Sequence, residues 1–350
     1  MRPWTKRFPL PWPCRVVVLT LLIAATSLSL SMSARADEPV RVLVVGGHNN
    51  HNWKLSNPYL KQLLDADPDI EATIENSPQG GATKEDWERW TPNFAKYDCV
   101  LLNYNGKMWH ERQKREFEVY IRGGGTAIVV HAANNSFTGW TEYEKMVALL
   151  WRPPSFGYSL NVNDDGSVTR VDPGKGRGMG HGGIFDWVMT TRDAKHPITA
   201  GMPTRWMHLR DELYHGQRGP AKNVNILLTA FSDPKHGGTG KHEPIVWWTP
   251  YGKGKVVTNL MGHIGDIRCM GCVGFQTVVR RSAEWLARGE ATTPIPANFP
   301  TEKATSEVKI DVKALQEQAK KPAGPTLAAS AARAHRIIAS NRGQTSLHDR

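Results

Sequence analysis

The chain has 350 residues, and its 44 basic and 33 acidic side chains give a formal net charge of +11. The excess lies at the two ends, because residues 37–300 hold 30 basic and 28 acidic residues. A nucleic-acid-binding protein would keep a basic stripe on its folded part, so we exclude that class.

The first 36 residues have the three parts of a secretory signal peptide. Basic residues come first, residues 16–30 form an apolar core, and Ala34-Arg35-Ala36 is a small-x-small cleavage site. We therefore expect cleavage after Ala36 and an exported mature protein, either periplasmic or secreted. No later stretch is long and apolar enough to span a bilayer, so no membrane partner is expected after cleavage.

Strand and helix patterns alternate over the first half of the mature chain. Short apolar, β-branched runs predict strands, and the amphipathic stretches between them predict helices. The predicted strands cover residues 41–47, 70–75, 97–103 and 126–130, and the predicted helices cover residues 57–65 and 110–122. Residues 87–94 are too broken to assign. The alternation predicts an α/β fold with a doubly wound, mostly parallel, flavodoxin-like sheet.

The pattern loosens after residue 150. Residues 174–183 are rich in glycine but lack the spacing of a phosphate-binding loop, so a mobile loop that contains His181 is the simpler interpretation. Residues 206–215 have no clear periodicity. Further strands are predicted at residues 185–190, 224–230, 245–249 and 255–260, with a hairpin turn at 251–254 and a last helix at 274–288.

The composition changes near residue 300. Residues 301–350 are rich in Lys, Ala, Pro and Glu and hold few large apolar side chains, so they are predicted to form a low-complexity, disordered tail. Residues 37–300 are then a single domain.

Three cysteines remain after signal cleavage. Cys99 lies in a predicted strand and is expected to be a buried thiol. Cys269 and Cys272 form a C-x-x-C pair, for which a local disulfide is the leading interpretation in an oxidising compartment. Half of a zinc site and a redox-active pair are the alternatives, although no second C-x-x-C pair or thioredoxin-like context is present.

The segment at residues 123–143 is the strongest pointer to a functional site. Three glycines precede a buried strand pattern that ends at His131, and two asparagines, Ser136 and Trp140 follow. In an open α/β sheet, ligands bind beyond the carboxyl ends of the strands. His131 is therefore a candidate site residue, with a strand-capping histidine as the structural alternative.

Several pieces of the chain, in order, resemble the trehalose-utilisation (ThuA-like) family, a branch of the class I glutamine amidotransferase-like fold. They run from about residue 41 to residue 289 and include Gly46-Gly47 with His51 and Trp53, the GGG–VVHAA–SF–W segment, the DELY of residues 211–214, and YGKGKV before Gly262-His263. The resemblance implies a role in the use of trehalose and related disaccharides, including sugars oxidised at C3. It also implies loss of glutaminase chemistry, because the turn that carries the amidotransferase nucleophile holds His131 and Ala132 here.

The candidate site residues follow predicted strands or the family pieces. His131 and Glu212 are the catalytic candidates, and His51, His131 and His263 are candidate ligands for a divalent metal such as zinc. The candidate substrate-binding residues are His51, Asn103, Asn105, Trp140, His181 and Tyr214. His263 reaches the common edge only if its strand runs parallel to the others, and the position of Glu212 cannot be derived from sequence.

These parts suit one reaction on a small carbohydrate ligand. A ketone at C3 of a glycosyl unit acidifies the proton on C2, so that a base, His131 or Glu212, can expel the oxygen on C1; hydrolysis and isomerisation are related outcomes. A metal or the Asn103 and Asn105 amides would polarise the ketone. The alternatives are a non-catalytic sugar-binding module, in which the histidines donate to sugar hydroxyls, and a metal-dependent hydrolase on another carbohydrate. The oligomeric state is open.

Overall fold

The computed structural model of this protein describes residues 38–263 and 267–320. The predicted signal peptide and residues 321–350 lie outside these ranges. Within them, no helix combines the length and the apolar character needed to cross a membrane.

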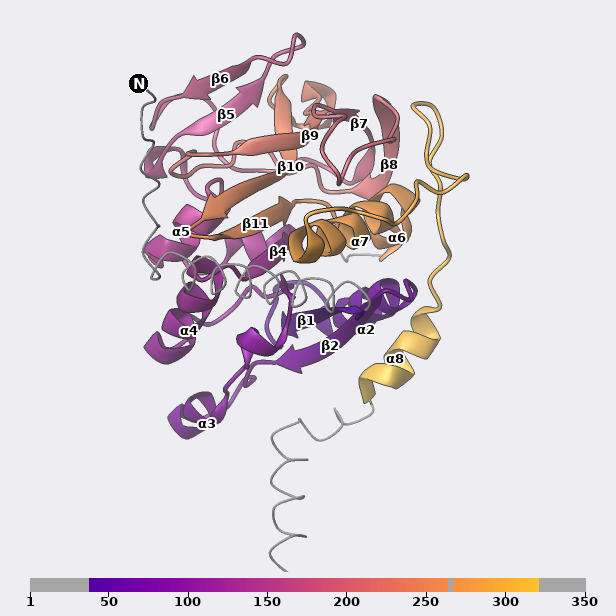
Figure 1. The fold of residues 1–350 in the computed structure, drawn as a ribbon. Coiled ribbons are helices and arrows are strands. Elements are labelled where there is room, and N and C mark those ends of the chain that lie inside the picture. Colours follow the sequence, from indigo (N-terminus) through magenta and orange to yellow (C-terminus); the bar gives the residue numbers. More distant parts are fainter. Residues whose placement is uncertain (1–37, 264–266, 321–350) are drawn as a thin grey trace, which may run out of the picture.

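One mixed sheet organises the fold (Figure 1). Five neighbouring strands are parallel, in the spatial order β2 (Ile70–Asn76), β1 (Val40–Gly46), β3 (Cys99–Leu102), β4 (Thr126–Val130) and β11 (Gly254–Asn259). All residues of β3 and β4 are buried, as expected for unbroken apolar runs covered on both faces of a parallel sheet. The predicted α/β fold is confirmed.

Helices cover both faces of the parallel strands. Helices α2 (Trp53–Asp65) and α7 (Val273–Arg288) pack against each other and against β1. Helix α4 (Glu111–Arg122) packs on β4 and β11, and the short helix α5 (Thr141–Val147) packs on β10 and β11. This arrangement leaves the carboxyl ends of β1, β4 and β11 at one edge of the sheet, where their loops can meet.

An antiparallel extension continues the sheet beyond β11. Its strands, in spatial order, are β10 (His242–Tyr251), β9 (Asn225–Phe231), β7 (Phe185–Thr191) and β8 (Arg205–Asp211). The predicted turn between β10 and β11 is confirmed, with Gly252 at a φ of 60°. β8 lies in the segment that sequence periodicity left irregular, and β5 (Ser159–Val162) and β6 (Val168–Val171) form a hairpin in another such segment. β6 has only four residues and is mostly exposed, so it carries no alternation of buried and exposed positions that a sequence pattern could detect.

Sequence analysis also missed the short helices α3 and α6, as it missed α5. Helix α3 (Lys84–Arg89) begins at Thr83 with a capping box, in which Thr83 and Asp86 each accept from the other's backbone N–H. Helix α6 (Arg268–Gly271) precedes α7. Both are too short to show a helical period.

The tail predicted at residues 301–350 is ordered in its described part, so that boundary is corrected. Val308 donates its backbone N–H to Gly271, and Val273 donates to Ser306, which ties this segment to α6 and α7. Helix α8 (Val312–Lys320) then lies against α2 (Figure 1). Leu315 is 1% exposed, and Ile310 and Val312 pack against the core, so a few apolar side chains and paired backbone groups order a segment whose composition indicated disorder.

The predicted disulfide between Cys269 and Cys272 is wrong. Both residues are buried thiols, as is Cys99, for which that state was predicted. The Cys269 thiol donates to the carbonyl oxygen of His263, and the Cys272 thiol lies beside the imidazole of His208. Each sulfur therefore has a polar neighbour other than the second sulfur.

Glu243 on β10 provides a test of buried charge. Its carboxyl group is buried and accepts from the Gly216 N–H at 3.1 Å and the Thr239 hydroxyl at 2.7 Å, and burial raises its pKa to about 7. The unfolded chain loses this proton at lower pH than the folded chain, so this group favours unfolding as pH rises through 7.

Glu243→Gln keeps both contacts, because the Thr239 hydroxyl can turn to accept, but it removes the charge. Between pH 5 and pH 8, we expect the free energy of unfolding to fall by about 2 kcal/mol less in the variant than in the wild type. Urea unfolding at the two pH values measures this. If the free energy of unfolding depends on pH in the same way in both proteins, the raised pKa of the buried Glu243 carboxyl group is contradicted.

Candidate functional site

Three histidines from three parallel strands meet at one edge of the sheet. His131 follows β4 directly, while His51 and His263 lie in the loops after β1 and β11. The ring centroids of His51 and His263 are 4.7 Å apart, those of His51 and His131 5.0 Å, and those of His131 and His263 5.5 Å. His263 was predicted to reach this edge only if its strand runs parallel to the others, and β11 is parallel to β4.

Glu212 brings a carboxylate to the same point from the far end of the sheet, directly after β8. Its carboxylate oxygens lie 3.4 Å from His263 Nε2, 3.5 Å from His131 Nε2 and 3.7 Å from His181 Nε2. The side chains of Glu212 and His263 are each 12% exposed, and that of His181 is 37% exposed. Four imidazoles therefore surround one carboxylate that solvent can still reach, and we call His51, His131, His181, His263 and Glu212 the histidine–glutamate cluster.

A subset of this cluster has the spacing of a metal site. One ligand atom from each of His51, Glu212 and His263 can be chosen so that all three lie within 4.8 Å of one another. Two imidazoles and a carboxylate are a donor set that suits zinc and similar divalent ions, with room for a further ligand. The predicted metal residues His51 and His263 belong to this subset, whereas Glu212 takes the place predicted for His131.

His51 is oriented in the way that metal-binding histidines usually are. Its Nδ1 lies 3.2 Å from Asn49 Oδ1, and Asn49 also accepts from the His51 backbone N–H at 3.0 Å. An amide oxygen can only accept, so Nδ1 carries the proton and Nε2 keeps its lone pair. A second partner that fixes the tautomer leaves the other ring nitrogen available as a ligand.

His131 occupies a strained position. Its φ is 44°, in the left-handed region that a residue with a side chain rarely adopts, and its ring is 3% exposed. Nδ1 lies 2.8 Å from the Leu260 carbonyl oxygen, so Nδ1 carries the proton and donates. Within the described residues, Nε2 has no partner closer than Glu212, 3.5 Å away. This nitrogen is a buried base that faces the centre of the cluster.

The charge state of the cluster favours cation binding. Burial, together with the neighbouring rings of His131 and His263, lowers the pKa of His51 to about 4, and burial likewise lowers the pKa of His263. Burial alone would raise the pKa of Glu212, but the surrounding histidines outweigh it and lower that pKa. At neutral pH His51 and His263 are therefore neutral and Glu212 is ionised, which are the forms that bind a metal.

An aromatic wall lines one side of the cluster. The Tyr214 ring is buried with its centroid 4.4 Å from that of His131, and the Trp151 ring is 4.5 Å from Tyr214 and 5.9 Å from His181. Tyr214 was predicted as a substrate-binding residue, whereas Trp151 was missed. Its place at the start of a loose segment gave no signal in the sequence.

His181 reaches the cluster on the glycine-rich segment. Gly180 and His215 exchange two backbone hydrogen bonds, and the Arg218 guanidinium donates to the Arg177 carbonyl oxygen at 3.0 Å. Hydrogen bonds on both sides of residue 178 therefore hold in place the segment that was predicted to be a mobile loop.

The two asparagines predicted to bind substrate make hydrogen bonds that hold loops together. Asn103 is 5% exposed, and its amide group donates to Ser56 Oγ and Asn57 Oδ1, each at 2.7 Å. It also accepts from Asn49, the residue that orients His51. Asn105 donates to Asn50 Oδ1 at 2.7 Å and accepts from Ser136. Both asparagines therefore support the loop that carries His51, and substrate contact through the half-buried Asn105 stays a prediction.

The prediction that Trp140 stacks on a sugar is wrong. Its side chain is 4% exposed and its indole N–H donates to Glu118 at 2.6 Å. Its ring packs in an aromatic cluster with Phe137, Tyr143 and Trp109, with centroids 5.1 to 5.9 Å away. Trp109, in the same aromatic cluster, is 1% exposed. Both are core residues.

Sequence analysis also missed Asp211. This side chain is fully buried and accepts from the backbone N–H groups of Glu212, Gly262 and His263. Its neighbour Glu212 was selected, but nothing in the sequence says which of two adjacent carboxylates turns into the core.

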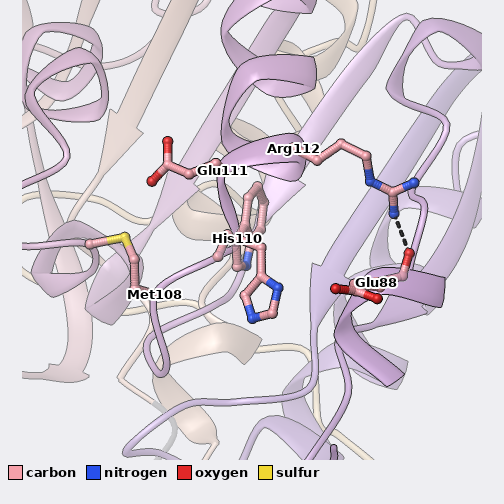
Figure 2. Close-up of a pocket in the computed structure, with 6 residues that line it drawn as sticks. Glu88, Met108, His110, Glu111 and Arg112 are labelled. Atoms are coloured by element: carbon pink, nitrogen blue, oxygen red, sulfur yellow. Dashed lines mark hydrogen bonds between the residues drawn. The ribbon is translucent and has the colours of Figure 1, made fainter. Parts of the chain in front are cut away.

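Two hollows lie away from the cluster. The larger, of about 700 Å³, is open and is lined by residues at the start of α4 together with Glu88; there Arg112 donates to the Glu88 carbonyl oxygen (Figure 2). The smaller, of about 230 Å³, lies on the antiparallel extension beside Phe231 and His242. Neither contains a predicted site residue.

Comparisons with known proteins agree with this architecture. A family model described as ThuA, trehalose utilisation, matches residues 41–286. The solved structure of a ThuA-like protein from Parabacteroides merdae ATCC 43184 is 35% identical in sequence, with a TM-score of 0.73 over 77% of this chain and 98% of that chain. Another ThuA-like protein, from Bacteroides uniformis ATCC 8492, is 15% identical, with a TM-score of 0.47 over 73% of this chain and 96% of that chain. No curated protein matches the chain.

Proposed function

This chain belongs to the ThuA, or trehalose-utilisation, family, and from that premise we propose that its histidine–glutamate cluster is the active site of a metal-dependent enzyme acting on 3-keto-glycosides or trehalose-type disaccharides. The family supports a role in carbohydrate metabolism. The observation that carries the proposal is the convergence of His51, His131, His263 and Glu212 from four separate strands.

The donor set divides into a metal-binding part and a base. His51, His263 and Glu212 would hold a divalent ion, because their ligand atoms lie within 4.8 Å of one another and are in the metal-binding protonation state. A bound ion would polarise a carbonyl group on the substrate and thereby acidify the neighbouring C–H. His131 then stays outside the metal-binding subset.

His131 is the base in this proposal. Its Nδ1–H is held by Leu260, so the unprotonated Nε2 can accept the proton from C2 of a 3-keto-glycosyl unit. The electrons of the broken C2–H bond form the C1–C2 double bond, the C1–O bond breaks, and the leaving oxygen takes up a proton. Addition of water to the double bond completes a net hydrolysis.

The remaining side chains would bind and surround the sugar. Trp151 and Tyr214 offer ring faces beside the base, and carbohydrate C–H faces stack on such rings. His181 is the most exposed member of the cluster and would donate to a hydroxyl group at the entrance. We further propose that the protein works after export, from the signal-peptide pattern of residues 1–36, and without glutaminase activity, since His131 and Ala132 occupy the nucleophile turn.

Metal content and turnover test this function together. Purified protein should contain close to one equivalent of a divalent metal, and it should convert 3-keto-trehalose or a 3-keto-glucoside. Prolonged dialysis against a chelator should lower the turnover number at least about a hundredfold, and zinc or another divalent ion should restore it. His236→Ala, which changes a histidine stacked on Phe185 outside the cluster, is the matched control and should behave as wild type.

Two outcomes would redirect the proposal. If turnover is unchanged after dialysis against the chelator, the proposed role of a metal is excluded. If the metal-loaded protein binds the sugars but converts none of them, it is a sugar-binding module. His131→Ala separates these cases, because an enzyme keeps its affinity and loses turnover, whereas a binder loses affinity.

A further inference from the structure

Asp211 joins two parts of the cluster that the sheet itself does not join. Glu212 follows β8 and His263 follows β11, and three strands, β10, β9 and β7, lie between β11 and β8 in the sheet order. No ladder of backbone hydrogen bonds can therefore set the position of one loop relative to the other. A direct link between them has to come from side chains.

Asp211 supplies that link with both carboxylate oxygens. Oδ1 accepts from the backbone N–H of Glu212 at 2.8 Å and of His263 at 3.0 Å. Oδ2 accepts from the backbone N–H of Gly262 at 2.7 Å and lies 2.7 Å from His208 Nε2. One buried carboxylate thus holds two of the three residues that offer metal-ligand atoms, Glu212 and His263, on two separate loops.

The surroundings leave this carboxylate no alternative partner. Asp211 and His208 are both 0% exposed, so water cannot replace a lost contact. His208 lies on β8, three residues before Asp211, and the thiol of Cys272 at the start of α7 is its other polar neighbour. The four donors around Asp211 fill its two oxygens, and a carboxylate has acceptor sites for all four.

We propose that Asp211 is a positioning residue of the site, which fixes Glu212 and His263 in the geometry that binds the metal. The proposal rests on the proposed function for its effect on the metal, but its structural content stands on the hydrogen bonds alone. Residues that hold metal ligands in place typically change metal affinity by about 10- to 100-fold when altered.

The decisive variant is Asp211→Asn. An amide has one oxygen and one NH₂ group, so whichever way it turns, the NH₂ group faces at least one backbone N–H. We expect the zinc dissociation constant, measured with zinc alone by calorimetry, to rise about 10- to 100-fold. Amide hydrogen exchange at Gly262 and His263 should become faster, while exchange at Val257 in β11 stays unchanged.

Asp186→Asn is the matched control. Asp186 on β7 is exposed and its Oδ1 accepts one backbone N–H, from Arg210, at 2.8 Å. The same chemical change there should leave zinc affinity within twofold and exchange at Gly262 and His263 unaltered. A general loss of stability would instead accelerate exchange throughout the sheet.

The exchange measurement separates this inference from the function. If the wild type binds no zinc, the proposed function fails, yet slow exchange at Gly262 and His263 would still support the link. Fast exchange at both amides in the wild type would overturn the inference, even where Asp211→Asn does not fold. Unchanged zinc affinity and unchanged exchange in a folded Asp211→Asn variant would overturn it as well.

Discussion

Glu212→Gln is expected to lower kcat/KM on a 3-keto-glucoside at least about a hundredfold and to raise the zinc dissociation constant by a similar factor. The substitution keeps the size of the side chain but removes the negative charge that faces His131, His181 and His263 at 3.4 to 3.7 Å. Neutral imidazoles alone would then have to hold a dication, and a carboxamide is a weaker ligand than a carboxylate.

Calorimetry with zinc and steady-state kinetics measure the two effects on the same preparation. Glu302→Gln is the control, since it removes an exposed carboxylate that pairs with Arg205 at 2.7 Å, away from the cluster. Its zinc affinity and turnover should equal those of the wild type. If Glu212→Gln retains both properties, the carboxylate is not a ligand and the centre of the site has to be sought elsewhere.

Trp140→Ala is expected to lower the free energy of unfolding by about 3–5 kcal/mol, the usual range for removal of a buried indole. The ring is 4% exposed, and it packs among Trp109, Phe137 and Tyr143. The variant leaves a cavity, and it also removes the indole N–H that donates to Glu118. Urea unfolding gives the magnitude.

Phe231→Ala provides the comparison, because its ring is 45% exposed; we expect a change within about 0.5 kcal/mol. Sugar affinity should be unchanged in Trp140→Ala wherever the protein is folded. A small stability loss accompanied by loss of sugar binding would restore the stacking role that burial argues against.

Sequence patterns were most informative where burial is complete. The runs that became β3 and β4 are apolar throughout, and a strand covered on both faces leaves that signature directly in the sequence. The polar residues after β4 and β11 could be placed at one edge because parallel strands fix which of their ends meet. That argument predicts from the sequence that His51, His131 and His263 lie together, as the structure shows.

Sequence patterns were less informative where an interaction partner decides the structure. β8 mixes buried and exposed residues irregularly, with a shifted register opposite β7, so its period is broken and Glu212 could not be placed. Composition ranks Trp140 as a candidate for sugar stacking as readily as for core packing; only the surrounding rings decide. A C-x-x-C pair in a chain predicted to be exported suggests a disulfide, but both thiols are free, and their polar partners are His208 and the His263 carbonyl group.

The ordered segment after residue 300 has a consequence for the boundaries of this protein. The family match ends at residue 286, yet the backbone pairing of Ser306 and Val308 continues the structure, and Leu315 is buried. The same segment borders α6, whose Cys269 contacts the His263 carbonyl group. A truncation after residue 286 would therefore remove the contacts that hold α6, next to the proposed metal ligand His263. The folded unit that this protein needs is thus longer than the segment that the family model matches.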